Sequence, residues 1–85
     1  MNDSTQLNRI FWQSRRGMLE LDLLLVPFAT RCYVTLNPQQ KLLYESFLTH
    51  EDQDLYAWLM HKAPPADARY GELIDLILEN SRRRD

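Results

Sequence analysis

Eight consecutive residues near the start of the chain carry the residue types from which a binding surface could be built. They are Arg15-Arg16-Gly17-Met18-Leu19-Glu20-Leu21-Asp22. Arginine presents a planar fork of donors to carboxylates, and carboxylates accept charge-assisted hydrogen bonds. Gly17 is one of only two glycines in 85 residues, and a glycine inside a helix costs about 0.8–1 kcal/mol relative to alanine. We therefore expect Gly17 to mark a turn between two helices or the close approach of a partner.

An aromatic side chain extends this set of charged residues. If the first helix continues to Arg16, then Arg9, Trp12 and Arg16 lie at i, i+3 and i+7 and share one face. Glu20 would follow close to that face. Tryptophan and arginine are among the residue types most enriched in binding hot spots. The residues alone leave two interpretations open: Trp12 lies on an exposed binding surface, or it belongs to the core and the charges are merely solvated.

The sequence has no recognisable pattern for catalysis or metal binding. His50 and His61 are the only histidines; each falls at an expected helix end, and they lack the spacing of zinc ligands. Glu51, Asp52 and Asp54 suit helix capping and solvation, since a calcium loop also needs an internal glycine and a distal glutamate. No nucleophile has a positioned base, and the isolated glycines form no phosphate loop. The sequence predicts a protein that is not an enzyme, with no catalytic, metal-binding or cofactor-binding residues.

Length and composition indicate one domain, residues 1–85. Hydrophobic residues make up 45% and charged residues 26%, as in ordinary globular domains. The net charge of −2 argues against a dedicated nucleic-acid binder. A single cysteine, Cys32, excludes an internal disulfide, fits a reducing compartment and is expected to be a small buried hydrophobe.

The two ends of the chain and its longest apolar run bear on localisation. The first residues are polar and lack the apolar stretch of a signal peptide. The run from Leu19 to Ala29 is too short and too charged to cross a bilayer. Arg82, Arg83 and Arg84 could contact nucleic acid or anionic lipid, but a solvated tail frayed over residues 81–85 is favoured. We expect a cytoplasmic protein.

The apolar spacing is helical throughout, and it predicts an all-α, compact five-helix bundle. Asn37, Pro38 and Gln40 form a start signal with a capping box. Asp52 is the expected cap of the next helix, and Pro27 is expected to kink or shape the end of the second one. The five helices are expected at residues 3–5 to 15–16, 18–29, 38–48, 53–61 and from 66 or 67 to about 80.

The segment Arg16-Gly17-x-x-Glu20 resembles the RGxxE signature of the SdhE family of small assembly factors, whose eukaryotic relatives are called succinate dehydrogenase assembly factor 2. The resemblance extends over about residues 7 to 80, and nothing is carried onto the tail. Further matching residues are Arg9, Trp12, Leu21-Asp22, Pro27-Phe28 and Asp54-Leu55-x-x-Trp58-Leu59-Met60.

The resemblance implies a domain that binds the flavoprotein subunit of succinate dehydrogenase, fumarate reductase or both. It implies that this domain promotes covalent attachment of FAD to a histidine of that subunit, through the 8α carbon of the isoalloxazine. The FAD then belongs to the partner, with at most a transient contact to this chain. The free protein is expected to be a monomer that neither binds nucleic acid nor inserts into a membrane. The implied partner-binding residues are Arg9, Trp12, Arg15, Arg16, Gly17, Glu20 and Asp22.

Two other classes of function stay open on the residues alone. One is a regulatory module that binds a different protein, as an antitoxin does. The other is a helical nucleic-acid-binding module that uses Arg15, Arg16 and the arginine tail and binds with steep salt dependence. The acidic balance of the chain counts against this second class, and a free flavin binder has little support because no dinucleotide fingerprint exists.

Overall fold

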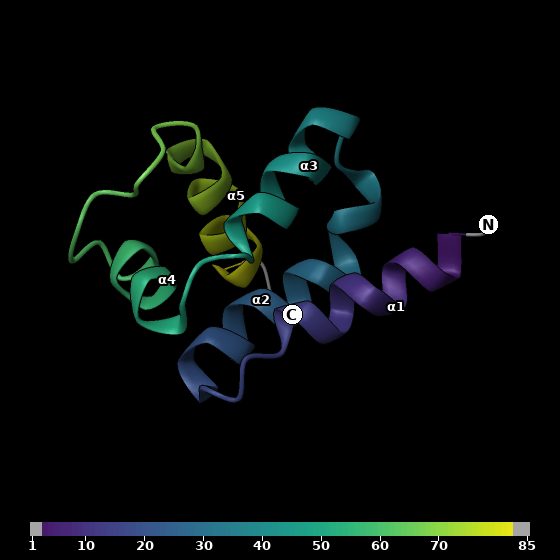
Figure 1. The fold of residues 1–85 in the computed structure, drawn as a ribbon, viewed down its shortest axis with the longest axis horizontal. Coiled ribbons are helices and arrows are strands. Elements are labelled where there is room, and N and C mark those ends of the chain that lie inside the picture. The colour runs from purple at the N-terminus through teal and green to yellow at the C-terminus, as the bar shows by residue number, and fades with distance from the viewer. Residues whose placement is uncertain (1–2, 83–85) are drawn as a thin grey trace.

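The computed structural model describes residues 3–82 and consists there of five α-helices and one short 3₁₀ helix (Figure 1). The prediction of an all-α, compact five-helix bundle is confirmed. The elements are α1 (Asp3–Ser14), α2 (Leu19–Arg31), η1 (Tyr33–Thr35), α3 (Pro38–Phe47), α4 (Asp52–Leu59) and α5 (Tyr70–Arg82).

Helix α2 is the centre of the packing, because it contacts α1, α4 and α5. Its buried residues Leu21, Leu25 and Phe28 follow one another at i, i+4 and i+7, which places them on one face. The N-terminal end of α1 extends away from the other helices (Figure 1). The remaining large side chains of the core are Ile10, Tyr33, Tyr44, Phe47, Leu48, Leu55, Trp58, Leu59, Tyr70, Leu73, Ile74 and Ile77.

Helix α1 ends at Ser14, one or two residues before the expected end. The Ser14 hydroxyl is fully buried; it donates to the Ile10 carbonyl at 2.8 Å and shares a hydrogen bond of 2.7 Å with the Tyr44 hydroxyl. Burial raises the pKa of the Tyr44 phenol, so this hydroxyl stays neutral and able to donate. The pair therefore ties the end of α1 to α3 in the middle of the core.

The start of α3 follows the sequence prediction. The Gln40 backbone N–H donates to Asn37 Oδ1 at 2.8 Å, and the Asn37 N–H donates to Gln40 Oε1 at 3.0 Å, which completes the capping box. The predicted cap of α4 is wrong: Glu51 occupies the N-cap, its side chain makes no capping hydrogen bond, and Asp52 is the first helical residue. The Asp52 carboxylate is instead bonded to Arg16.

Two other helix boundaries differ from the prediction. Helix α2 continues to Arg31 with Pro27 inside it. Pro27 has no N–H to donate to the carbonyl of Leu23, four residues earlier, and Leu23 is 57% exposed. Helix α5 begins at Tyr70 rather than 66 or 67, because Asp67 folds the preceding residues into a turn. The Asp67 carboxylate accepts from the Arg69 backbone N–H at 2.9 Å and from its guanidinium at 2.6 Å. These hydrogen bonds lower the pKa of Asp67 to about 2.

The fold also places several residues away from the loop at Gly17. Leu42 on α3 is 67% exposed. Ser81 and Arg82 continue α5, whereas residues 83–85, the rest of the arginine tail, lie outside the described residues. Cys32 is half-buried and donates to Asn80 Oδ1 at 3.1 Å, so it packs at the edge of the core.

Helix α4 ends in a Schellman motif. The His61 N–H donates to the Trp58 carbonyl at 3.2 Å, and the Lys62 N–H donates to the Ala57 carbonyl at 2.7 Å. His61 itself has a φ of 58°, the left-handed conformation that this motif usually assigns to glycine. A residue with a Cβ is strained in that conformation.

We predict that His61→Gly raises the free energy of unfolding by about 0.5–1 kcal/mol. Removing the Cβ relieves the strain of the left-handed conformation, and this gain is larger than the entropic cost of a more flexible unfolded chain. Urea unfolding followed by far-UV circular dichroism measures the change. His61→Ala keeps the Cβ and serves as the control, for which no gain is expected. A loss of stability in the glycine variant would contradict the prediction.

Candidate partner-binding site

The connection between α1 and α2 is a tight loop with Gly17 at its centre. Gly17 is exposed and has a φ of 84°, a conformation that favours glycine. A Cβ built at this position would meet nothing within 4 Å. The glycine is therefore required by the local backbone and not by crowding inside the protein. The predicted turn between two helices is confirmed, and the space outside the loop is open to a partner.

The side chain of Arg16 turns inward from this loop and is only 16% exposed. Its guanidinium makes four hydrogen bonds: Nε to Asp52 Oδ1 at 2.8 Å, Nη1 to the carbonyls of Gln13 at 3.0 Å and Leu48 at 2.9 Å, and Nη2 to the carbonyl of His50 at 2.9 Å. Four of the five N–H donors of the group are thus engaged. Arg16 joins the end of α1, the connection between α3 and α4, and the first residue of α4.

Asp22 holds the same loop from its other end. Its Oδ1 accepts a hydrogen bond of 2.7 Å from the backbone N–H of Arg16. Arg16 and Asp22, both expected at the partner surface, therefore make internal hydrogen bonds that shape the loop. The expectation that Arg9, Trp12 and Arg16 share one helical face is wrong, since α1 ends at Ser14 and the Arg16 side chain points towards residues 48–52.

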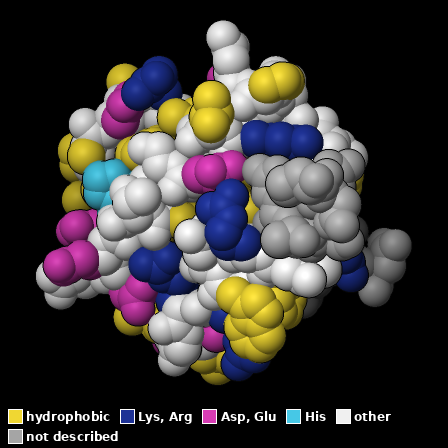
Figure 2. Space-filling view, turned by 45° about the vertical axis from the view of Figure 1, so that its right-hand side comes forward, with side chains coloured by type: hydrophobic (Ala, Val, Ile, Leu, Met, Phe, Trp, Pro, Cys, Tyr) yellow, Lys and Arg dark blue, Asp and Glu magenta, His cyan; other side chains and the backbone are white. Residues whose placement is uncertain are grey.

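The other predicted surface residues lie exposed on α1 and the loop. Trp12 is 63% exposed, so the interpretation that placed it in the core is wrong. Its ring lies edge-on to Phe11 at 5.4 Å, and the Arg15 guanidinium lies 5.8 Å from its centroid. Arg9 is exposed as well. Figure 2 shows basic, acidic and apolar side chains interspersed over one face of the molecule.

Glu20 is exposed in the first turn of α2, three residues after Gly17. A carboxylate at a helix N-terminus is favoured by the helix dipole. Within residues 3–82 no hydrogen-bond donor or cation pairs with it, so both oxygens are available to an incoming group. The predicted set thus divides into two supporting residues, Arg16 and Asp22, and a surface formed by Arg9, Trp12, Arg15, Gly17 and Glu20.

Sequence reasoning missed the groups that hold Arg16. Three of them are the backbone carbonyls of Gln13, Leu48 and His50, and a carbonyl carries no residue-type signal. Asp52 was noticed only as a cap. The imidazole ring of His50 takes part in packing. Its Nε2 lies 3.1 Å from the Tyr70 hydroxyl, and the ring packs edge-on against Trp58.

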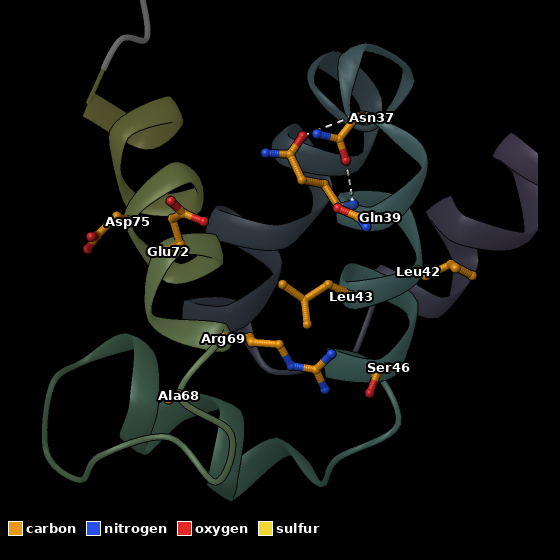
Figure 3. A pocket seen from close by; sticks show the side chains of 10 residues that line it. Asn37, Gln39, Leu42, Leu43, Ser46, Ala68, Arg69, Glu72 and Asp75 are labelled. Carbon is orange, nitrogen blue, oxygen red and sulfur yellow. Dashed lines mark hydrogen bonds between the residues drawn. The ribbon is translucent and has the colours of Figure 1, made fainter.

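An open groove between α3 and α5 lies apart from the predicted residues (Figure 3). Leu43 and Arg69 point into it, whereas Leu42 points away from α5 (Figure 3). Glu72 and Asp75 also line the groove, and carboxylates oppose an anionic ligand such as the diphosphate of a dinucleotide.

Over the described part of the chain, no three His, Cys, Asp or Glu side chains are grouped as a metal site requires. No described helix has the length and apolarity needed to cross a membrane.

Comparison with known proteins gives a consistent match over nearly the whole chain. A family model described as the flavinator of succinate dehydrogenase matches residues 8–81. A protein of Pseudomonas putida named FAD assembly factor SdhE is 47% identical over 79 residues, which cover 93% of this chain and 94% of the relative. Proteins of the same name from Francisella tularensis and Pectobacterium atrosepticum are 38% and 39% identical, over 93% and 91% of this chain and 82% and 88% of theirs.

We predict that Arg16→Ala lowers the free energy of unfolding by about 2–4 kcal/mol, because it removes charge-assisted hydrogen bonds and leaves half-buried acceptors without donors. The neighbouring Arg15→Ala is the matched control: Arg15 is exposed, and its loss should change stability by about 1 kcal/mol or less. Urea unfolding measures both variants. Equal effects of the two substitutions would show that the inward bonds of Arg16 do not stabilise the fold.

Proposed function

Because this chain belongs to the family described as the flavinator of succinate dehydrogenase, we propose that it binds the flavoprotein subunit of succinate dehydrogenase and promotes covalent attachment of FAD to it. The observation that carries the proposal is the pre-organised loop at residues 15–20. There the bare backbone of Gly17 and the carboxylate of Glu20 face solvent while Arg16 and Asp22 hold the loop from behind.

The proposed mechanism is conformational. The loop docks beside the flavin site of the subunit and favours one arrangement of its mobile domains, so that the population of the reactive arrangement rises. In that arrangement the histidine and the flavin of the subunit lie in position to react, and proximity accelerates bond formation. The assembly factor supplies no nucleophile of its own in this mechanism, so it is not an enzyme.

Each residue of the site has a distinct part in the docking. Gly17 lets the backbone of the loop approach the partner closely. Glu20 accepts charge-assisted hydrogen bonds from the partner. Arg9, Trp12 and Arg15 enlarge the contact area with residue types that are common in binding hot spots. Arg16 and Asp22 fix the loop before binding, which lowers the entropy lost when the complex forms.

The remaining expectations complete the proposal. FAD belongs to the partner and touches this chain at most transiently; the carboxylates of Glu72 and Asp75 in the groove between α3 and α5 oppose its diphosphate. Fumarate reductase, which the family resemblance also implies, is proposed as a second client. The free protein acts as a monomer in the cytoplasm, without nucleic acid and without insertion into a membrane.

We predict that Glu20→Ala reduces covalent flavin on the flavoprotein subunit about 10-fold or more, because a contact at the centre of the interface is lost. Cells that lack this protein are complemented with wild type or variant, and the fluorescence of the denatured subunit is measured in a gel. Glu72→Ala is the matched control, since Glu72 is also an exposed carboxylate in the first turn of a helix.

The deletion tests the assembly function, and the Glu20→Ala variant tests the position of the docking site. Unchanged fluorescence in cells that lack the protein would overturn the assembly function. Fluorescence restored as well by Glu20→Ala as by wild type would leave the function in place and show that the docking site lies elsewhere.

A further inference from the structure

The solvent face of α2 carries two leucines next to Glu20. Leu19 is 68% exposed and Leu23 is 57% exposed. They stand at i and i+4, and Glu20 stands three residues before Leu23, so the Leu23 side chain neighbours both Leu19 and Glu20 on the helix surface. Gly17, with open space beside its backbone, lies directly before this turn of the helix.

The fold does not account for these two leucines. The face that α2 buries against the other helices is formed by Leu21, Leu25, Phe28 and Ala29. Leu19 and Leu23 lie outside that face, where they add nothing to the core. Polar residues would serve the folded chain equally well there. An apolar pair kept in water beside a proposed docking loop is best explained by a partner that covers it.

We propose that Leu19 and Leu23 are the apolar anchor of the docking surface, and that they fit an apolar pocket on the flavoprotein subunit with an arginine or lysine at its edge. This inference rests on the proposed function and extends the same site. The anchor supplies binding energy through burial, while Glu20 and Gly17 supply orientation.

The charge of Glu20 indicates that the edge of the partner's pocket is cationic. A partner that covers Leu19 and Leu23 also removes water from the adjacent carboxylate. A desolvated carboxylate without a partner is strongly unfavourable. Within residues 3–82 nothing pairs with Glu20, so the cation must come from the partner. An apolar pocket with a cationic rim is therefore the surface that complements all three side chains.

The same charge disfavours the two alternative occupants. A second copy of this chain, packed by a two-fold axis on the leucines, would bring two Glu20 carboxylates near each other, and like charges across an interface oppose association. An anionic lipid surface would be repelled by Glu20. Two leucines on one face are also less than the broad apolar stripe of a membrane-surface helix.

The test measures binding of the full chain to the purified, FAD-free flavoprotein subunit by isothermal titration calorimetry. The double variant Leu19→Gln, Leu23→Gln removes the anchor and keeps good helix formers of similar length. We expect its Kd to rise about 10- to 100-fold, as for loss of a central hot spot. Leu42→Gln on α3 is the matched control, because Leu42 is equally exposed at 67%, and its Kd should stay within about 2-fold.

A second pair of variants tests the cation. Glu20→Gln should weaken binding and make the Kd less dependent on salt, since one ion pair is lost. Glu20→Lys should weaken it further, because it places like charges together. Thermal unfolding of every variant checks that the fold is retained, which exposed positions should allow.

Each outcome bears on the proposal. A double variant that binds like wild type, while Glu20→Ala does not bind, overturns the anchor and leaves the proposed function standing. A wild-type chain that does not bind the subunit overturns both. Sedimentation of the chain alone showing a dimer that the double variant abolishes, or co-sedimentation with vesicles of anionic lipid lost in that variant, would assign the leucines to a second copy or to a membrane and overturn the proposal.

Discussion

The guanidinium of Arg16 is the interaction on which the arrangement of the site depends. It joins the C-terminal turn of α1, the connection between α3 and α4 and the first residue of α4 through four hydrogen bonds. A domain of 85 residues buries a small core, and its loops have few apolar contacts to fix them. A half-buried arginine with its donors satisfied substitutes for those contacts, because charge-assisted hydrogen bonds are strong and directional.

Within this short motif, some residues hold the loop in place and others are left free to contact a partner. The backbone N–H of Arg16 is held by Asp22, and its side chain is held chiefly by residues 48–52, where α3 connects to α4. Gly17 and Leu19, which lie between Arg16 and Asp22, are therefore presented outward in a fixed conformation. Glu20 and Leu23 follow on the rigid face of α2. A surface fixed in this way loses little conformational entropy on binding, which suits a protein that must impose one arrangement on a mobile partner.

Local signals in the sequence predicted the elements well where neighbouring residues decide the structure. The capping box of Asn37 and Gln40 is complete within four residues, so its outcome does not depend on the rest of the fold. The start of α5 was missed because Asp67 prefers its hydrogen bonds to Arg69 over helix initiation. The cap of α4 was missed because Asp52 is engaged by Arg16, which lies 36 residues earlier.

The sequence by itself determined the helical period, the turn at Gly17 and the RGxxE resemblance, since each of these is encoded in residue types at short spacing. Only the tertiary structure decided which side chains face out. Trp12 and Leu42 lie on the surface, and Arg16 turns in. Arg16 turns in because it bonds chiefly to backbone carbonyls and to a carboxylate that folding brings near. A carbonyl looks the same at every position of a sequence, so its role becomes visible only when distant segments of the chain meet.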